Sequence, residues 1–430
     1  MPRAAQVRYP AWRMSLASVV SRIAHDTCVD EPVLLPEGDH WWEHLAPDFP
    51  ELSEPFRLAL RDRLQVRATA ATDVVLRTLG ACLVGVTAMP LGYGPEKLKQ
   101  ALADRSFYGP MAESGDATRF FESPPRGVQV KTARARFPRF RPPDGICNDL
   151  SFESPFVPAN PRERGSYLRH RENRVARARH WRHEGGPRPT IMAIHGFSAD
   201  LYLLNEWFFA LPWLYRMGFD VCLVTLPFHG ERQPRFSPFS GHGFFAGGIN
   251  RINEAFAQGV YDFRIFLDHF QHTLGVREVG VTGVSLGGFT SGLLAAVEPR
   301  LRFAIANVPV ASVPDLVHEW EPMGAIVRYA MKRHGLTLPD ARHLLAVSCP
   351  LTYAPKLSRE RLFVIGGVGD RLAPPKHTRL LWDHWGRGPI HWFPGSHLLH
   401  LDRGEYLREI GRFLRRIGFF DGLGPPALGR

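Results

Sequence analysis

The 430-residue chain lacks the marks of several protein classes, beginning with paired cysteines. Its five cysteines are odd in number, lie far apart and form no CxxC pair, so we expect reduced thiols and no disulfide framework. The 40 glycines and 37 prolines follow no period, which excludes a collagen-like chain, and 44% hydrophobic residues exclude a wholly disordered one. The N-terminus shows no apolar segment of a secretory signal. A folded, cytoplasmic protein is therefore the expectation.

Lysine is scarce as well, because it supplies only six of the 53 basic residues behind the net charge of +11. The charge concentrates in residues 126–188, which hold 15 basic and 6 acidic residues (15 − 6 = +9). No zinc-finger spacing, aromatic RNA-binding signature or helix-turn-helix pattern accompanies it, so we expect no nucleic-acid partner. A solvated basic face is the first interpretation, and a peripheral contact with an anionic membrane is the alternative.

One apolar run in the N-terminal part of the chain raises the question of a membrane. Residues 74–91 carry a single charge, Arg77, but contain two glycines and Pro90 and are slightly short for a spanning segment. We expect a buried or surface-packed helix here, with a membrane-associated helix as the alternative.

The sequence changes character near residue 125. Residues 1–125 are predicted to form a mainly helical N-terminal extension, in which we find no catalytic pattern. Its candidate amphipathic helices cover residues 15–27, 55–69 and 96–104. Residues 126–430 are predicted to form one α/β domain.

Within residues 126–430, strand patterns alternate with helix patterns. Two runs of alternating apolar and polar residues, 128–137 and 173–181, predict strands with one arginine-bearing wet face. Short apolar runs predict further strands at 190–194, 219–226, 278–282, 303–306, 362–365 and 390–393. Apolar strands separated by helices predict a mostly parallel sheet that is covered on both faces and carries all its strand carboxyl ends at one edge.

Ser285 lies in the pattern Gly283-Val-Ser-Leu-Gly287, between a predicted strand and a predicted helix. A turn this tight forces the serine into strained backbone geometry, so the residues two before and two after it need to lack side chains. The turn also leaves the backbone N–H of Leu286 at a helix N-terminus, where it can stabilise an oxyanion. We predict that Ser285 is a nucleophile; the alternative is a glycine-rich turn with an incidental serine.

A serine nucleophile needs a base and an acid. His397 is the candidate base, because it follows the last predicted strand and so shares the edge of the serine; His391 and His400 are its rivals. Asp370 ends a strand and a glycine-rich turn and is the candidate acid, with Asp315 as the runner-up. The order Ser, Asp, His along the chain fits a nucleophile elbow.

The segment His195-Gly196-Phe197 follows the first strand of the regular region. A loop at this place can supply a second oxyanion donor, for which the backbone N–H of Phe197 is the candidate. The alternative is a turn that merely ends the strand.

With these motifs, residues 126–418 resemble the α/β-hydrolase superfamily. The segment 195–197, the pattern around Ser285, Asp370 and His397 occur in the family's order. The resemblance implies an α/β-hydrolase fold with a mostly parallel eight-stranded sheet, in which the two arginine-rich runs are the antiparallel strands that begin the sheet. It also implies an elbow serine, an acyl-enzyme and no metal or organic cofactor.

Three segments near the predicted catalytic edge bear on the substrate and the subfamily. Residues 307–360 insert about fifty residues between two strands, where the resemblance implies a lid. Residues 227–248 carry five phenylalanines and five glycines, which predicts an apolar acyl pocket, with a purely structural use of the rings as the alternative. Residues 226–232 depart from the Asp and Gly-x-Gly turn of many family members, which leaves the subfamily open.

Together these features predict a serine hydrolase that acts on a small-molecule carboxylic ester with an apolar acyl group. Two alternatives stay open at this point: an amidase or peptidase that uses the same three residues, and a binding protein that keeps the fold without turnover.

Overall fold

The computed structural model describes residues 24–25, 40–401 and 403–421. At its centre is a nine-stranded sheet in the order β11-β10-β9-β8-β6-β7-β5-β4-β3. The strands of this sheet are β3 (Lys131–Arg134), β4 (Gly145–Glu153), β5 (Val175–His183), β6 (Thr190–Ile194), β7 (Asp220–Thr225), β8 (Val279–Val284), β9 (Ala304–Asn307), β10 (Leu362–Gly367) and β11 (Ile390–Phe393). Strands β1 (Ala24–His25) and β2 (Phe56–Arg57) form a separate antiparallel pair.

The sheet is parallel from β11 to β7 and antiparallel at its other end, where β5 pairs with β7 and β4, and β4 pairs with β3. The prediction of a mostly parallel sheet is confirmed. The predicted number of eight strands is wrong, because the described residues contain nine in this sheet. The two arginine-rich runs are β3 and β5, and an unpredicted strand, β4, lies between them.

β4 escapes the sequence pattern because polar residues interrupt its apolar ones. Its buried residues Cys147, Leu150 and Phe152 do not alternate strictly, and Asp149 stands among them. The structure places Asp149 beside Arg179 of β5, with Oδ1 2.7 Å from Nε and Oδ2 3.1 Å from Nη2. The polar residue therefore has its partner on the neighbouring strand, which the pattern of one segment does not reveal.

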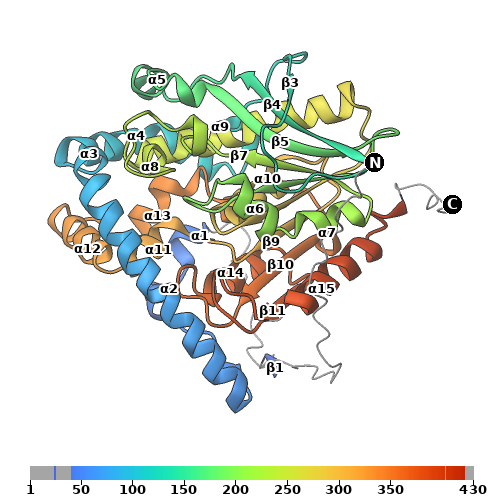
Figure 1. Cartoon of the computed structure of the whole chain (residues 1–430). Helices are drawn as coiled ribbons and strands as arrows, with labels where there is room; N and C mark the ends of the chain where they lie inside the picture. The colour runs from blue at the N-terminus through green and yellow to red at the C-terminus, as the bar shows by residue number, and fades with distance from the viewer. Residues whose placement is uncertain (1–23, 26–39, 402, 422–430) are drawn as a thin grey trace.

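Helices cover both faces of the sheet, as predicted (Figure 1). The face packed by α7 and α15 is opposite the face packed by α9 and α10. The helices are α1 (Trp41–His44), α2 (Leu60–Thr87), α3 (Met89–Gly92), α4 (Pro95–Glu113), α5 (Pro161–Leu168), α6 (Tyr202–Phe208), α7 (Leu211–Arg216), α8 (His242–Phe245), α9 (Ile249–Asp268), α10 (Leu286–Val297), α11 (Val313–Glu319), α12 (Met323–Arg333), α13 (Leu338–Ala346), α14 (Pro375–His384) and α15 (Arg403–Arg416).

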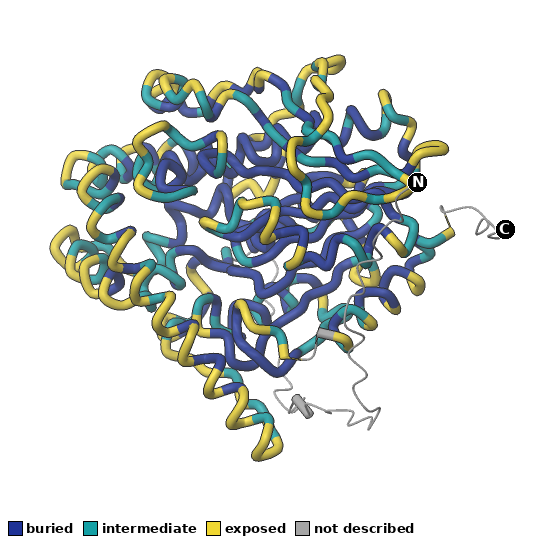
Figure 2. The backbone as a smooth tube through the Cα atoms, in the orientation of Figure 1, coloured by how far each residue is buried: buried dark blue, intermediate teal, exposed yellow. Residues whose placement is uncertain are grey.

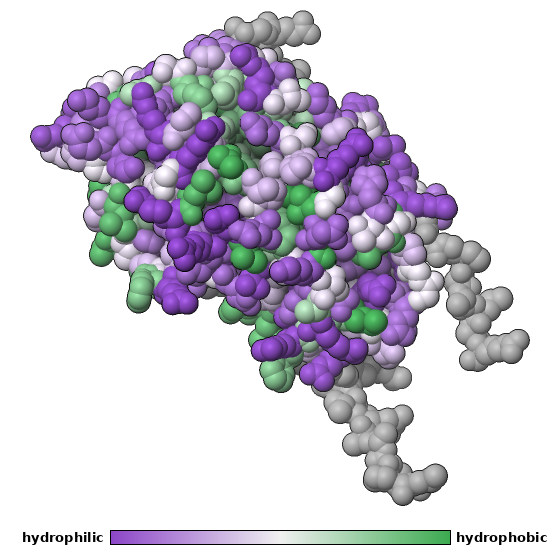
Figure 3. Space-filling view, turned by 90° about the horizontal axis from the view of Figure 1, so that it is seen from above, coloured by the Kyte–Doolittle hydropathy of each residue, from purple (hydrophilic) through white to green (hydrophobic). Residues whose placement is uncertain are grey.

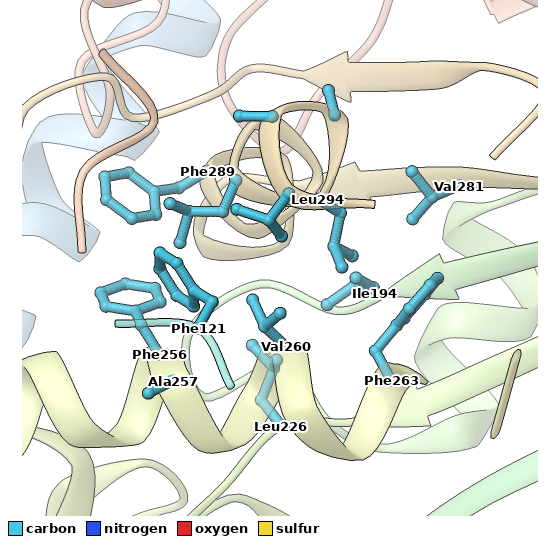
Figure 4. Packing of buried hydrophobic residues seen from close by; sticks show 14 of the residues in the cluster. Phe121, Ile194, Leu226, Phe256, Ala257, Val260, Phe263, Val281, Phe289 and Leu294 are labelled. Atoms are coloured by element: carbon cyan, nitrogen blue, oxygen red, sulfur yellow. The ribbon is translucent and has the colours of Figure 1, made fainter. Parts of the chain in front are cut away.

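The residues of the central strands alternate between two buried clusters. Met192 and Ile194 belong to the larger cluster, which α9 and α10 cover, whereas Ile191 and Ala193 belong to the smaller one, which α7 and α15 cover. Figure 4 shows part of the larger cluster, where Phe256 of α9 faces α10. Burial on both faces explains why the central strands are uninterrupted apolar runs in the sequence.

Residues 40–125 share this core. Trp41 and Trp42 of α1 and Phe121 belong to the larger buried cluster. The predicted helices at 55–69 and 96–104 correspond to the beginning of α2 and to α4, although α2 continues to Thr87 and so takes in most of the apolar run. The predicted helix at 15–27 lies outside the described residues, except that Ala24–His25 form strand β1 instead.

Helix α2 runs along the outside of the molecule, where much of it is exposed (Figures 1 and 2). Among the described residues it is the one helix that is long and apolar enough to cross a membrane by length and composition, and 22% of its most apolar window is buried.

The basic segment 126–188 forms β3, β4, β5 and α5 at the top of Figure 1. Figure 3 views the molecule from above and shows a mostly hydrophilic surface with apolar side chains in separate small groups. Several arginines of this segment pair with acids, among them Arg162 with Asp104, Arg174 with Glu153, Arg177 with Glu231 and Arg179 with Asp149. An open groove of about 560 Å³ is lined by Arg134, Arg136, Phe137 and Arg141. It lies at the edge of the sheet where the parallel strands begin.

Candidate active site

Ser285 lies at the carboxyl end of β8 and directly before α10. Its φ of 56° and ψ of −112° fall outside the regions that a residue with a side chain ordinarily adopts. Its N–H donates to the carbonyl of Asn307 on β9 at 2.9 Å, and its carbonyl accepts the N–H of Phe289 at 2.9 Å. The strained position predicted for the serine is therefore present and is held from both sides.

The glycines around Ser285 are required by close backbone contacts. A Cβ atom at Gly283 would lie 2.0 Å from the carbonyl oxygen of Gly287, and one at Gly287 would lie 2.0 Å from the carbonyl oxygen of Ile194. Because these neighbours are backbone atoms of a turn and a central strand, they cannot give way. A side chain is excluded at both positions, as the pattern predicts.

His397 and Asp370 meet at the carboxyl edge of the sheet. Asp370 follows β10 and His397 follows β11, on the side of the sheet beyond β8 and β9. His397 Nδ1 lies 2.7 Å from Asp370 Oδ2, and both side chains are buried. Asp370 Oδ1 accepts the N–H groups of Leu372 and Ala373 at 2.9 and 2.8 Å. The carboxylate is thus fixed by its own loop, with one oxygen directed to the imidazole.

The pKa of His397 is held above its usual value. Burial acts to lower this pKa, but the charge and the hydrogen bond of Asp370, together with the charge of Asp73, outweigh it. An imidazolium ion at His397 is therefore stabilised by nearby carboxylates. This suits a base that takes up a proton during a reaction and then returns it.

The rival residues have other partners. Asp315 is fully buried and pairs with Arg342, with Oδ1 2.7 Å from Nη2 and Oδ2 3.1 Å from Nε. His391 lies within β11, where burial lowers its pKa to about 4. His400 forms an isolated antiparallel bridge with Gly395. The geometry brings Asp370 and His397 together and gives the rivals no place in that pair.

The segment 195–197 passes beside the serine. A Cβ atom at Gly196 would lie 3.5 Å from the Cβ of Ser285, which is ordinary van der Waals contact. His195 is buried, with Nδ1 2.8 Å from the Gly196 carbonyl, and its Nε2 accepts the N–H of Leu226 at 3.0 Å. Since Nε2 is an acceptor, the imidazole is neutral, in agreement with burial, which lowers its pKa. His195 therefore shapes the loop that carries Phe197, the predicted oxyanion donor.

The five phenylalanines after β7 divide between the core and the surroundings of the serine. Phe228 and Phe244 are fully buried, so the structural interpretation of the rings applies to them and the pocket interpretation does not. Phe239 and Phe245 contact the ring of Phe197, with ring centroids 5.8 and 5.0 Å apart. The fifth ring is exposed at the surface.

An apolar cluster, which we call the α2–α12 cluster, adjoins the ring of Phe197. Its buried members are Ala81, Val84 and Ala88 of the N-terminal extension and Met323 of the insertion, and Phe197, Phe239, Ala246, Val317, Trp320 and Val327 pack against it. Trp320 also donates from Nε1 to the carbonyl of Leu372 at 3.0 Å, two residues from Asp370. The insertion predicted as a lid and the N-terminal extension therefore both reach the predicted catalytic edge.

Asp73 is a residue of this site that the sequence analysis misses. It lies on the inward face of α2, is fully buried, and its Oδ2 accepts the N–H groups of His397 at 2.8 Å and of Arg371 at 3.0 Å. Burial, and then the charge of Asp370, raises its pKa. The sequence did contain a signal for Asp73. It and Arg77 are the two charged residues of the apolar stretch 68–91, and their spacing of four places them on one helix face, which indicates a shared polar contact.

Cysteines and groups of possible metal ligands are predicted to form no disulfide and no metal site. The four described cysteines, Cys82, Cys147, Cys222 and Cys349, form no disulfide, and Cys28 lies outside the described residues. In the part of the chain that the structure describes, no three or more His, Cys, Asp or Glu side chains are grouped to hold a metal ion.

Comparisons with known proteins bear on the fold. No protein-family model matches the chain. Its relatives include uncharacterized proteins from two strains of Mycobacterium tuberculosis, each 28% identical over 335 residues that span 76% of this chain and 77% of the relative. Among solved structures it is similar to an acetyl xylan esterase from Paenibacillus sp. R4, with a TM-score of 0.50, 15% identity and coverage of 73% of this chain and 94% of that one. The chain has the α/β-hydrolase fold. Acetyl xylan esterase 1 from Thermoanaerobacterium sp. JW/SL YS485 is also similar, with a TM-score of 0.49, 18% identity and coverage of 73% and 93%.

Within the α/β-hydrolase fold of this chain, the departure at residues 226–232 has a structural explanation. The N–H of Leu226 is bound by His195, as described above. Arg232 is fully buried, pairs with Asp262 at 2.6 Å and donates to the carbonyl of Thr225 at 3.0 Å. The turn after β7 is therefore held by the buried Arg232–Asp262 ion pair and by His195. Many family members build this turn with an Asp and glycines instead.

Proposed function

We propose that this chain is a serine hydrolase that cleaves a carboxylic ester, with an apolar acyl group favoured, through an acyl-enzyme on Ser285. The observation that carries the proposal is the hydrogen bond between His397 Nδ1 and Asp370 Oδ2 at the sheet edge where Ser285 has a positive φ. The buried carboxylate fixes the imidazole through Nδ1, which leaves Nε2 to act as the base.

The proposed reaction proceeds in two halves. His397 Nε2 takes the proton of Ser285 Oγ while Oγ attacks the ester carbonyl carbon, and the N–H groups of Phe197 and Leu286 stabilise the oxyanion. The carbon–oxygen bond to the alcohol then breaks, and the alcohol leaves with the proton from His397. Water attacks the acyl-enzyme with His397 again as base, which releases the acid and restores the serine. The N-terminus of α10 adds a favourable dipole at the oxyanion.

An apolar acyl group is favoured by what surrounds the oxyanion loop. Phe197 carries the proposed donor, and its ring contacts Phe239 and Phe245 and packs against the α2–α12 cluster. Described side chains of this cluster are uncharged, so a polar acyl group would lose water without gaining hydrogen bonds there.

Labelling of the purified protein with a fluorophosphonate tests the nucleophile. Ser285→Ala should abolish labelling and lower ester turnover by several orders of magnitude without changing thermal unfolding. Ser291→Ala is the matched control, because this serine is buried on α10 and lies outside the strained turn. Wild-type turnover in Ser285→Ala would show that the proposal is wrong.

Substrate panels then separate the remaining alternatives. p-Nitrophenyl esters from acetyl to octanoyl should be cleaved with a rate that rises with chain length, and equal rates would contradict the apolar pocket. Faster cleavage of matched anilides would identify an amidase or peptidase. A folded wild-type protein that takes up no label would indicate a binding protein that keeps the fold without turnover.

Two interpretations stay open for residues 126–188, a solvated basic face and, as the alternative, a peripheral contact with an anionic membrane. The groove lined by Arg134, Arg136 and Arg141 offers positive charge for it, but it lies at the edge of the sheet opposite Ser285. A bilayer bound there would not face the proposed active site. Vesicle binding that falls with added salt and with Arg134→Glu combined with Arg136→Glu would support this contact.

A further inference from the structure

One helix of the N-terminal extension holds both loops that carry the proposed base and acid. Asp370 lies on the loop after β10, and His397 lies on the loop after β11. Asp73 Oδ2 bridges them, because it accepts one N–H from Arg371 on the first loop and one from His397 on the second. Arg77, one turn further along α2, donates from Nη1 to the Arg371 carbonyl at 3.3 Å.

The position of Asp73 is unfavourable for stability alone. Its side chain is fully buried near Asp370, and both burial and that neighbouring charge raise its pKa. Its Oδ1 is buried without a hydrogen-bond partner among the described residues. An apolar residue on this helix face would avoid these costs. What an apolar residue could not do is satisfy the two N–H groups of the catalytic loops.

We propose that Asp73 is a positioning residue, whose carboxylate fixes the main chain at His397 relative to the Asp370 loop and so holds the base in line with its acid. The proposal rests on the proposed function. A main-chain hydrogen bond also joins the two loops, from the N–H of Gly369 to the carbonyl of Gly395 at 2.7 Å. That bond joins residues that precede Asp370 and His397, whereas the N–H of His397 itself has Asp73 as its acceptor.

The test compares two substitutions of Asp73 in the full chain by their rate of fluorophosphonate labelling. Asp73→Ala removes both acceptor bonds, whereas Asp73→Asn keeps an oxygen that can accept them. We expect labelling to slow at least about tenfold in Asp73→Ala and to recover most of the wild-type rate in Asp73→Asn, because a small displacement of a base has a large effect on rate. Thr69→Ala, a truncation on the buried face of α2 whose hydroxyl donates to the carbonyls of Gln65 and Val66 of the same helix, is the control for loosened packing.

The outcomes are separable by measuring labelling together with thermal unfolding. Wild-type labelling in Asp73→Ala overturns the positioning role while the nucleophile proposal stands. Equal slowing in Asp73→Ala, Asp73→Asn and Thr69→Ala overturns it as well, since the effect would then follow helix packing alone. Absence of labelling in the folded wild-type protein removes the proposed function, and the positioning role falls with it.

A different observation concerns the outward face of the same helix. Val75, Leu79, Leu83 and Val86 are 57%, 62%, 45% and 75% exposed. Asp73 and Arg77, the charged residues of this part of α2, bind the loops that carry Asp370 and His397. The outward face from residue 74 to residue 86 therefore carries no charged side chain. Exposed arginines occupy the first turns of the helix, at positions 61, 63 and 67.

Helix α12 also has exposed apolar residues. It packs against α2 through the α2–α12 cluster and exposes Ile326 and Tyr329, at 48% and 66%. Lys332 and Arg333 follow in its last turn. In Figure 1 both helices lie at the outer side of the molecule, and Figure 2 shows exposed positions along each of them. We call these exposed apolar residues, with the basic residues at the ends of the two helices, the α2–α12 face.

We infer that the α2–α12 face docks on an anionic phospholipid bilayer. The apolar side chains would enter the acyl region while the basic helix ends contact anionic headgroups, which is the pattern of a helix that lies in the membrane surface. The helix does not cross the bilayer, because its inward face is bound to the protein through Asp73, Ala81 and Val84.

Sedimentation with phosphatidylcholine vesicles, with and without phosphatidylserine, tests this surface. We expect wild-type binding to phosphatidylserine vesicles that persists in part at high salt, and a fall of at least about tenfold in Leu79→Gln combined with Leu83→Gln, because apolar insertion supports binding. Arg134→Glu combined with Arg136→Glu is the matched control and should bind normally.

Three results would overturn the docking surface. The first is no vesicle binding, and the second is binding that is unchanged in the leucine variant. The third is binding that is lost only in the arginine variant, which would move the contact to residues 126–188. Size-exclusion chromatography completes the test: a wild-type dimer that the leucine variant converts to a monomer, without vesicle binding, would show that a second copy covers this face instead.

Discussion

Replacing Asp370 and Asp315 by asparagine, one at a time, separates a catalytic acid from a structural one. Both residues follow strands at the catalytic edge and both are buried. Their partners differ, because Asp370 binds the imidazole of His397 and Asp315 binds the guanidinium of Arg342. The two substitutions should therefore have opposite effects on catalysis and on stability.

The magnitudes follow from these contacts. Asp370→Asn keeps the shape but removes the charge that holds His397 in the correct tautomer, which costs about ten-thousandfold in kcat for such triads. Its amide oxygen can still accept the N–H groups of Leu372 and Ala373, so stability should change little. Asp315→Asn breaks a pair in which both side chains are 0% exposed. Breaking such a pair costs about 3–5 kcal/mol, out of the about 5–15 kcal/mol that folded domains have.

The assay measures labelling and ester turnover at a temperature where both variants are folded, and urea unfolding in parallel. We expect Asp370→Asn to be nearly inactive with wild-type unfolding, and Asp315→Asn to be active but to unfold at lower urea. An active Asp370→Asn, or a folded Asp315→Asn that takes up no label, would refute the assignment of the acid. The reasoning from burial would fail if Asp315→Asn unfolded like the wild type.

Three further predictions concern the turn, the base and a buried acid. Gly287→Ala should abolish labelling, because its Cβ would lie 2.0 Å from a carbonyl oxygen of β6. Gly288→Ala should keep part of the labelling, because the nearest contact of its Cβ would be at 3.0 Å. Equal labelling of the two variants would contradict the steric argument. The rate of labelling should rise with pH, with an inflection above the ordinary histidine pKa of about 6.5, because the raised pKa keeps His397 protonated to higher pH. An inflection below that value would count against the pairing with Asp370. Burial raises the pKa of Glu254 to about 7. The folded state then keeps a proton that the unfolded state releases above about pH 4.5, so the free energy of unfolding should fall by up to about 3 kcal/mol from there to pH 7, and urea unfolding of Glu254→Gln should lack this slope.

Strands and the serine turn could be predicted because their causes are local. A strand covered on both faces needs mostly apolar residues on both, so the predicted runs at 190–194 and 362–365 lie in the fully buried strands β6 and β10. The turn at Ser285 needs glycines two residues away on each side because the backbone contacts there are close. Such rules act within a few residues, and one sequence is enough to apply them.

The features that escaped prediction depend on partners far away in the chain. Asp149 in β4 is explained by Arg179, 30 residues later. Asp73 is explained by the N–H of His397, 324 residues later. The rings of Phe228 and Phe244 could not be assigned to the core or to a pocket until their contacts with Tyr167 of α5 and Phe256 of α9 were known. Burial of a polar residue is decided by the fold, and its local pattern resembles that of an ordinary exposed position.

The N-terminal extension connects the proposed chemistry with the proposed docking surface. The inward face of α2 carries Asp73 to the catalytic loops, while its outward face is apolar and exposed. Between the outward face and the oxyanion loop lies the α2–α12 cluster, which contacts the ring of Phe197. The same cluster is thus shared by the exposed helix and by the loop of the proposed oxyanion donor. The ester panel therefore tests the side of the cluster next to Phe197, and the vesicle assay tests the exposed face of α2. A preference for long esters without vesicle binding would confine the role of the cluster to binding the acyl group.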